Sequence, residues 1–172
     1  MQMVETPGIR GLILRRTFPE LDRSLIQRSL AKFPREVCRY VAREKCWYFN
    51  NGSVLEFGYC EREADVYQYQ SAEYSFIGFD ELTHFTYAQW DYLVNSRLRS
   101  SVPGAWPRVR AASNPGNVGH AWVKSLFIDG KEPDVVWEDH RGRKYPFIPA
   151  KVQDNPYLLQ NDPQYIARLE DL

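Results

Sequence analysis

The fold of this chain is decided by the stretch SFIGFDELTHF, residues 75–85. An apolar, aromatic-rich run stops abruptly there at two adjacent carboxylates, Asp80 and Glu81. A buried strand of a parallel sheet delivers side chains in this way to the carboxyl edge, where ligands bind in α/β folds. Two solvated acids that simply follow a strand explain the same string equally well. The rest of the sequence has to separate these two interpretations.

The composition is that of one globular domain. Of the 172 residues, 44% are hydrophobic and 15% aromatic, and no run is long and apolar enough to span a bilayer. Basic and acidic residues number 22 each, so the net charge offers no bulk attraction to nucleic acid. Cys38, Cys46 and Cys60 lack CxxC spacing, which predicts reduced, mostly buried thiols. With no secretory signal at the start, we expect a cytosolic protein.

Three elements precede the acidic stretch. The apolar residues 11–14 predict a buried parallel strand. Capping-box spacing that begins at Thr17 predicts an amphipathic helix over residues 17–33. The Asn51-Gly52 pair lies between two aromatic and apolar runs, so residues 46–59 are predicted to form a β-hairpin.

A helix and a strand follow the two acids. A second capping box, at Thr86, predicts a helix over residues 86–98. Residues 108–112 predict a strand that ends in Ser113-Asn114-Pro115. Asn-Pro-Gly taken alone is a turn. Beside a strand that ends in Asp80-Glu81, it places an amide where the amide can sense a phosphate or an attacking water.

The other segments carry weaker signals. The polar, tyrosine-rich residues 61–72 predict a short helix or a loop. Further along, a helix is predicted over 119–128, a strand over 135–137, an extended segment over 147–150, and a last helix that is capped by Asp162-Pro163.

Four basic residues are candidates for phosphate contacts. Arg15 and Arg16 lie where the first strand meets its helix, and either face a phosphate or serve as structural or solvated arginines. Arg143 and Lys144 belong to a basic turn that is the best local candidate for contact with DNA phosphates. A solvated hairpin tip is the more ordinary role of such a turn.

Taken in order, these pieces resemble the ATPase domain of the tailed-phage terminase large subunit, the motor that packages DNA into a procapsid. The matching residues cover nearly the whole chain and are Ile13–Thr17, Asn51–Ser53, Phe57-Gly58, Tyr69-Gln70, Ile77–Thr83, Arg97–Arg99, Ser113–Pro115, Gly119-His120, Trp122–Lys124 and Asp154–Leu158. No single motif is specific, but the ordered set is. The resemblance implies a three-layer α/β fold of the P-loop ATPase type, with a mostly parallel sheet and an added β-hairpin.

The resemblance also implies roles for matching side chains. Asp80 matches the Walker B acid that helps to hold Mg²⁺ through water, and Glu81 matches the catalytic carboxylate that polarises the attacking water. Ser113, Asn114 and Pro115 match the coupling motif that links nucleotide state to movement. The family therefore places both ATP chemistry and its mechanical output on the ends of two predicted strands.

The arginine finger of the family, which acts on a neighbouring subunit, is harder to place. Arg62, Arg97 and Arg99 are the candidates. Arg97 and Arg99 lie in residues 96–100, where the predicted helix that begins at Thr86 finishes, and cations there also stabilise the negative end of the helix dipole. Plain helix-end electrostatics is the more ordinary explanation for these two.

One expected part is missing from the sequence. No Gly-rich loop ending in Gly-Lys-Ser/Thr occurs, and Gly8-Ile9-Arg10-Gly11 has neither the lysine nor the hydroxyl that such a loop needs. We therefore expect residues 1–172 to be a partial ATPase domain, N-terminally truncated, that lies after the phosphate loop and before the nuclease domain. On this expectation the chain does not cut DNA.

The resemblance implies an intact protein that hydrolyses ATP with Mg²⁺ to move double-stranded DNA. Its partners are the portal protein, the small terminase subunit and further copies in a homo-oligomeric ring, in the cytoplasm of a bacterial host and without membrane contact. Two alternatives stay open. Asp80–His84 also resembles the acidic box of a helicase, and the absent phosphate loop favours a non-catalytic remnant or interaction module.

Overall fold

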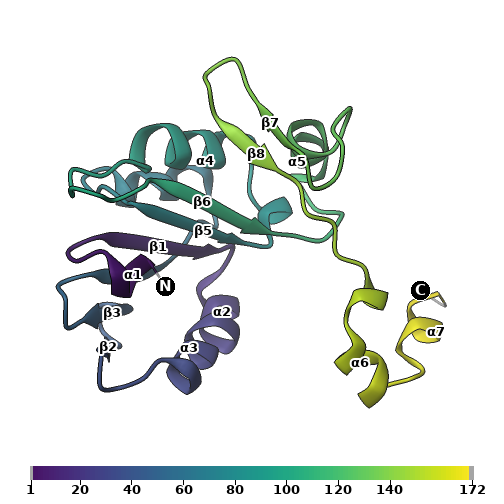
Figure 1. Ribbon diagram of the computed structural model, residues 1–172, viewed down its shortest axis with the longest axis horizontal. Coiled ribbons are helices and arrows are strands. Elements are labelled where there is room, and N and C mark those ends of the chain that lie inside the picture. Colours follow the sequence, from purple (N-terminus) through teal and green to yellow (C-terminus); the bar gives the residue numbers. More distant parts are fainter. Residues whose placement is uncertain (1, 171–172) are drawn as a thin grey trace. The chain divides into compact units, whose positions relative to one another are not determined.

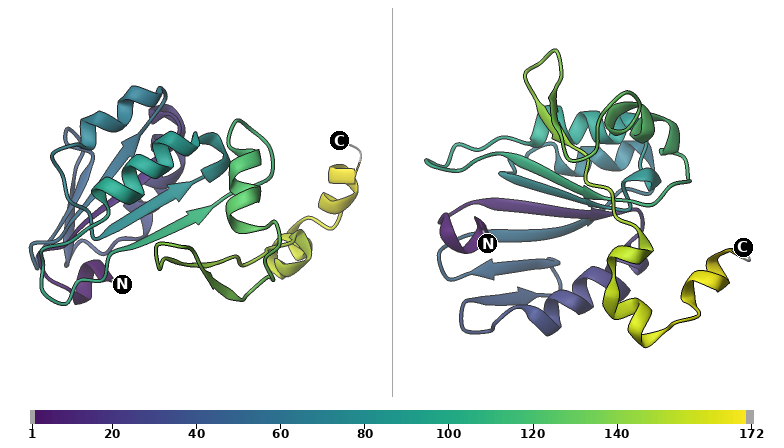
Figure 2. Two further views of the ribbon diagram at one scale, coloured as in Figure 1. Left: turned by 90° about the horizontal axis from the view of Figure 1, so that it is seen from above. Right: turned by 45° about the vertical axis from the view of Figure 1, so that its right-hand side comes forward.

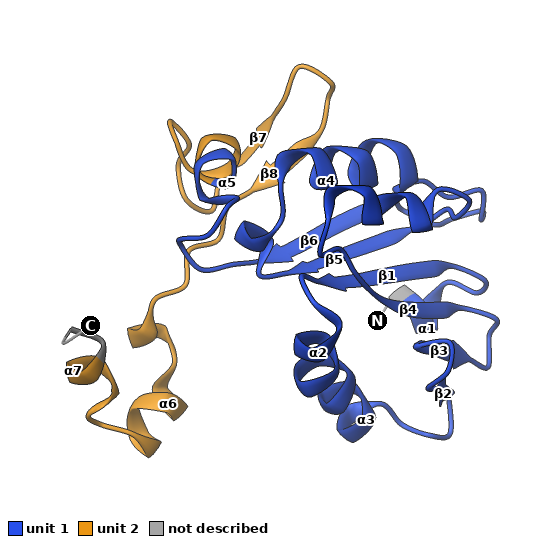
Figure 3. Ribbon diagram, turned by 180° about the vertical axis from the view of Figure 1, so that it is seen from behind, with its two compact units in different colours: residues 1–123 blue, residues 124–172 orange. Residues whose placement is uncertain are grey.

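The computed structural model describes residues 2–170, and side chains over residues 3–168. The chain divides into two compact units, which meet in sequence between Val123 and Lys124 (Figure 3). We call them the first and the second unit and describe each by itself. No helix of the described residues is long and apolar enough to cross a membrane.

The first unit is built on a six-stranded, mostly parallel sheet (Figure 1). Its strands are β1 (Arg10–Arg15), β2 (Cys38–Val41), β3 (Cys46–Phe49), β4 (Val54–Tyr59), β5 (Phe76–Asp80) and β6 (Arg108–Ala112). They are ordered β2-β3-β4-β1-β5-β6 across the sheet. The last four are parallel to one another, whereas β2 and β3 are antiparallel to their neighbours. The predicted α/β class and mostly parallel sheet are therefore confirmed.

The predicted hairpin is present as β3 and β4. Trp47 pairs with Leu55, and Gly52 in the connecting turn has φ +83°, a left-handed conformation that glycine adopts without strain. The hairpin also has a neighbour that the sequence did not reveal, because β2 pairs with the outer side of β3. β4 itself joins the parallel part of the sheet through β1.

One face of the sheet is covered by the helical segment that follows β1. It consists of α2 (Phe18–Leu21), a π-helical turn η1 (Asp22–Ile26) and α3 (Gln27–Lys32). A separate short helix, α1 (Gln2–Glu5), lies before β1. Thr17 caps α2 by accepting a hydrogen bond from the Glu20 amide, as predicted. The segment packs over the strands β1 to β4, where Trp47 and Leu55 are buried with Leu21 and Ile26 in one core cluster.

The opposite face is covered by η2 (Glu63–Tyr69), α4 (Tyr87–Tyr92) and the π-helical turn η4 (Leu93–Arg97) (Figure 2). The capping box at Thr86 is present, since Thr86 and Gln89 exchange hydrogen bonds between side chain and backbone. Trp90 of α4 lies against Phe79 of β5, with ring centroids 5.0 Å apart. Helices thus flank the sheet on both sides, and the acidic strand lies in its interior.

The sheet is least covered at β6. This strand pairs only with β5 among the described residues, and all its residues except Val109 are exposed. A shallow, open depression lies beside it on the α2 face of the sheet; its apolar lining is Ile13, Leu25, Phe76, Gly78 and Ala112. Strands of parallel sheets are normally buried on both faces, so β6 is an unusual edge.

The second unit is smaller. It contains the end of α5 (His120–Phe127), a hairpin of β7 (Val136–Glu138) and β8 (Lys144–Pro146), then η5 (Val152–Asp154), α6 (Pro156–Asn161) and α7 (Tyr165–Glu170). Trp137 and Tyr145 stack across the hairpin with ring centroids 4.7 Å apart. The predicted strand near residues 135–137 and the last helix are present, the predicted extended segment over 147–150 forms no strand, and α6 was not predicted.

Candidate functional site

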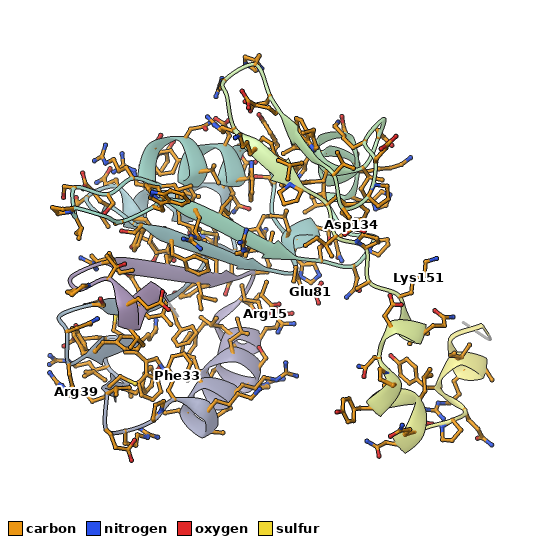
Figure 4. All side chains as sticks on the ribbon, in the orientation of Figure 1. Arg15, Phe33, Arg39, Glu81, Asp134 and Lys151 are labelled. Atoms are coloured by element: carbon orange, nitrogen blue, oxygen red, sulfur yellow. The ribbon has the colours of Figure 1, made fainter. Side chains whose placement is uncertain are left out.

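The candidate site lies at the carboxyl edge of the parallel strands in the first unit. Because β1, β5 and β6 run in the same direction, their last residues meet at one edge of the sheet (Figure 4). Leu14 pairs with Phe79, and Asp80 pairs with Ala112. The sheet register therefore brings together residues that lie far apart in the sequence.

Asp80, at the end of β5, forms an ion pair with Arg15, at the end of β1. Arg15 Nη1 lies 3.0 Å from Asp80 Oδ2 and also donates a hydrogen bond of 2.7 Å to Ser24 Oγ. Both side chains are partly exposed, at 20% and 28%. Arg15 Nε is buried without a hydrogen-bond partner among the described residues. Arg15 thus pairs with a carboxylate in this structure, which is the structural one of the two interpretations that the sequence left open.

Glu81 has an unusual backbone conformation. Its φ of 56° and ψ of 62° place it in the left-handed region, which non-glycine residues rarely adopt. The strand ends here, and the single turn η3 (Leu82–His84) follows immediately. Strained residues of this kind cluster at functional sites, where the surrounding structure holds them in place.

The loop after β6 reaches the same place. Asn114 Nδ2 donates a hydrogen bond of 3.4 Å to Glu81 Oε1, and Ser113 and Asn114 are both exposed. The predicted neighbourhood of the Asp-Glu pair and the Ser-Asn pair is therefore present in the structure. Pro115 follows in the same exposed loop.

The loop is anchored by a residue that the sequence analysis did not single out. Thr83 is 3% exposed, and its amide donates to Ser113 Oγ over 2.9 Å. Its hydroxyl donates to the Asn114 carbonyl over 3.0 Å. The polar Thr83 between the apolar Leu82 and Phe85 was the available signal, but nothing in the sequence shows which partner it meets.

The oxygen atoms of this edge suit a hard divalent cation. Carboxylates, an amide carbonyl and a hydroxyl are the ligands that Mg²⁺ takes, and Mg²⁺ usually keeps several waters and binds one or two carboxylates plus substrate phosphates. No group of three or more His, Cys, Asp or Glu side chains that could hold a metal ion exists among the described residues. Asp80 and Glu81 do not form an all-protein metal cage, so a magnesium ion at this edge would need further ligands such as phosphate oxygens and water.

Cys60, which follows β4, has the properties of a structural cysteine. It is fully buried, and its carbonyl accepts a hydrogen bond of 3.4 Å from Gln89 Nε2. Burial raises the pKa of the Cys60 thiol to about 12, so the thiol stays protonated at neutral pH. The predicted buried, reduced state holds for all three cysteines.

No protein-family model matches the chain, and no curated protein matches it at a significant level. The resemblance to packaging ATPases consequently rests on the sequence motifs alone.

Two of the three arginine-finger candidates lie far from the acids. Leu98 forms a bridge with Tyr74, just before β5 begins, so Arg97 and Arg99 flank the amino end of that strand. Six residues of extended chain separate Tyr74 from Asp80, which is about 20 Å. Arg97 Nη1 donates to the Gln70 carbonyl, and Arg99 Nε lies 2.9 Å from Glu73 Oε1. Neither arginine can reach the acids of its own chain.

Arg62 and Arg16 lie at the carboxyl edge and share a partner. Gln89, which is fully buried, donates over 2.9 Å to the Arg62 carbonyl and accepts over 3.0 Å from Arg16 Nη1. The side chain of Arg62 is exposed and forms no ion pair among residues 2–170. Arg16 has a structural partner, as one of the two sequence interpretations expected.

The basic turn belongs to the second unit. Arg143 and Lys144 stand at the start of β8, where Asp139 Oδ1 accepts hydrogen bonds from the amides of Arg141 and Arg143. These amide bonds hold the pKa of the Asp139 carboxyl below its usual value. Asp139 therefore shapes the turn, and Lys144 is exposed to solvent.

Proposed function

We propose that this chain is part of the ATPase domain of a DNA-packaging motor of the terminase large subunit type. The observation that carries the proposal is the meeting of three side chains at one sheet edge. Asp80 and Glu81 end an interior parallel strand, and Asn114 contacts Glu81 from the end of the next strand at 3.4 Å. A metal-holding acid, a water-orienting acid and an amide sensor in this arrangement are what ATP hydrolysis requires.

The proposed chemistry is in-line attack of water on the γ-phosphate of ATP. Glu81 accepts a hydrogen bond from the attacking water and orients it, and Asn114 contacts the Glu81 carboxylate from the loop after β6. Asp80 receives the hydrated cation through its carboxylate. A bound Mg²⁺ supplies charge that offsets the negative charge developing on the phosphate oxygens. The contribution of this chain is positioning, because phosphoryl transfer needs little covalent chemistry from the protein.

The Arg15–Asp80 ion pair gives this site a resting arrangement. With Arg15 at 3.0 Å, the charge of the Asp80 carboxylate is already partly compensated by the guanidinium. Asp80 would hold a hydrated Mg²⁺ through its carboxylate only if Arg15 shared this carboxylate with the ion or turned away from it.

The triphosphate needs a cradle that residues 1–172 do not contain, since no Gly-Lys-Ser/Thr loop occurs in the sequence. In this proposal, that loop comes from a segment that is not part of this chain. Among the described residues, β6 has an exposed edge without a strand partner, and an apolar depression lies beside it. In this proposal, an added strand pairs with that edge and completes the sheet.

The wider assembly belongs to the proposal as well. A homo-oligomeric ring on the portal protein, working with the small terminase subunit, moves double-stranded DNA as ATP is hydrolysed. Arg62 is the preferred arginine finger because its side chain is exposed and unpaired among the described residues, whereas Arg97 and Arg99 have partners at the other end of β5. Arg143 and Lys144 are the proposed DNA contacts.

One observation favours a second candidate, a non-catalytic interaction module. The ion pair with Arg15 balances the charge of the Asp80 carboxylate without any ligand, as expected where the carboxylate has only a structural role. Magnesium-dependent binding of a non-hydrolysable ATP analogue separates the two candidates. Binding to the chain extended by its in-frame upstream coding sequence supports the ATPase, and its absence supports the module.

Hydrolysis itself is tested on the same extended protein. Glu81→Gln is expected to retain ATP binding and to lower the steady-state rate at least about 100-fold, the scale of a lost water-positioning group. Glu36→Gln removes an exposed carboxylate in the connection between α3 and β2 and serves as the matched control. Equal rates for wild type and Glu81→Gln would refute the catalytic role.

A further inference from the structure

Every hydrogen-bonding group of Thr83 is used on the loop that follows β6. The amide donates to Ser113 Oγ at 2.9 Å, and the hydroxyl donates to the Asn114 carbonyl at 3.0 Å. The hydroxyl also accepts a hydrogen bond of 2.9 Å from Ser113 Oγ, and the carbonyl accepts one of 2.7 Å from the Gly119 amide. The buried side chain and the backbone of Thr83 thus form hydrogen bonds with both ends of residues 113–119.

At the end of this loop, Gly119 packs closely against the backbone of the turn after β5. A Cβ at Gly119 would lie 2.5 Å from the Phe85 carbonyl and 2.8 Å from the Thr83 carbonyl, closer than real Cβ atoms come to backbone. Trp122 Nε1 donates a hydrogen bond of 2.9 Å to the same Phe85 carbonyl. The turn after β5 and the start of α5 are therefore joined directly, and only glycine at position 119 permits this approach.

We propose that Thr83 is a positioning residue that holds Asn114 against Glu81 and ties this pair to the start of α5. The inference rests on the proposed function for its consequence, because it makes Thr83 the link between the water-orienting carboxylate and the loop that senses it. Thr83 touches neither substrate nor reacting atoms. Its effect on hydrolysis passes through Asn114 and Glu81.

The geometry explains why this link is needed. Asn114 is exposed, and its 3.4 Å contact to Glu81 is too long to fix either side chain alone. β6 has a strand neighbour on one side only among the described residues. The loop after β6 is consequently held from the β5 side, and Thr83 provides the buried, fully satisfied network that does so.

The first test uses the 172-residue chain and needs no ATP. In two-dimensional ¹⁵N–¹H NMR spectra, Glu81→Gln is expected to shift the side-chain amide signals of Asn114. We expect the same shift in a Thr83→Ser background, which keeps the hydroxyl, and its loss in Thr83→Val, which has nearly the same shape without the hydroxyl. An undiminished Asn114 shift in Thr83→Val overturns the inference.

A second variant protects this test against misfolding. Ser113→Ala changes an exposed residue, yet it removes the acceptor of the Thr83 amide and one of the two partners of the Thr83 hydroxyl. Exchange of the Thr83 amide with solvent is expected to rise roughly two- to tenfold, the scale of one net hydrogen bond. Unchanged exchange of this amide shows that the network does not hold the loop, and it refutes the inference.

The second test measures hydrolysis in the extended protein. Thr83→Val is expected to lower kcat about tenfold or more while KM for ATP changes less than twofold, because a displaced group costs rate and not binding. Thr83→Ser restores kcat. A Thr83→Val protein with wild-type kcat overturns the inference, whereas an inactive wild type that still shows the Asn114 shift refutes the proposed function alone.

Discussion

The left-handed backbone at Glu81 makes a quantitative prediction about stability. This conformation destabilises a residue with a Cβ by about 1–2 kcal/mol, whereas glycine adopts it without strain. Glycine also gains entropy in the unfolded chain, which costs about 0.4–1 kcal/mol when the chain folds. At φ 56° and ψ 62°, we therefore expect Glu81→Gly to be more stable than Glu81→Ala by roughly 0.5–1 kcal/mol.

The comparison is made between two variants because both lose the carboxylate and its contact with Asn114. Urea unfolding followed by tryptophan fluorescence is a suitable assay, since Trp47 and Trp90 are buried in the first unit. With a denaturant slope of about 2 kcal/mol per molar, the midpoint of the Gly variant should lie about 0.3–0.5 M above that of the Ala variant.

The control is a site with ordinary helical geometry. Ala31 is an exposed residue of α3, where glycine is expected to destabilise by about 1 kcal/mol relative to alanine. The order of the two residue types should therefore reverse between positions 31 and 81. If alanine is the more stable residue at both positions, Glu81 stores no strain and the argument from its backbone fails.

Two further outcomes follow from groups in the first unit. Arg15→Met should lower the free energy of unfolding by up to about 1 kcal/mol, because its ion pair with Asp80 is only partly exposed. In an Asp80→Asn background the same substitution should cost less, as measured by urea denaturation of both single variants and the double variant. Strictly additive effects of the two substitutions refute the coupling. Burial raises the pKa of Cys46 to about 11 and that of Cys60 to about 12, from an ordinary value of 9.0, so the folded chain should not react with Ellman's reagent at pH 8. The unfolded chain releases the two thiol protons at lower pH than the folded chain does. The contribution of the protonated thiols to the free energy of unfolding is therefore complete below pH 9 and is lost as the pH rises toward 11–12. Rapid labelling of these cysteines in the folded chain at pH 8 contradicts the raised pKa values.

The sequence predicted those features that depend on neighbouring residues. The strand of residues 76–80, the Asn51-Gly52 hairpin and the cap at Thr86 all follow from local signals, and all are present. β2 was missed because it has only four residues and carries the charged Arg39 in its middle, so the pairing with β3 decides its conformation. α6 was missed because Asn155-Pro156 is equally a turn signal and a helix start.

The site shows where sequence reasoning stops. Asp80 and Asn114 could be expected at one edge because parallel strands share it. The partner of Arg15 could not be found in this way, since 65 positions separate it from Asp80 and only the register of β1 on β5 brings them together. Arg97 and Arg99 were candidates from sequence for an arginine finger that acts on a neighbouring subunit, and their place at the amino end of β5 follows only from the bridge between Leu98 and Tyr74.

The open edge of β6 and the buried network of Thr83 belong to one physical problem. A parallel strand in the middle of a sheet is fixed by hydrogen bonds on both sides, but β6 is fixed by β5 alone among the described residues. Arg108 and Arg110 keep this exposed edge charged, which discourages pairing with the wrong strand. A strand that docks on the free side of β6 would shift the loop carrying Asn114, and Thr83 would pass that shift to the turn at Glu81. On the proposed function, completion of the sheet would therefore act on the Glu81 carboxylate through the contact that Asn114 already makes with it in this structure.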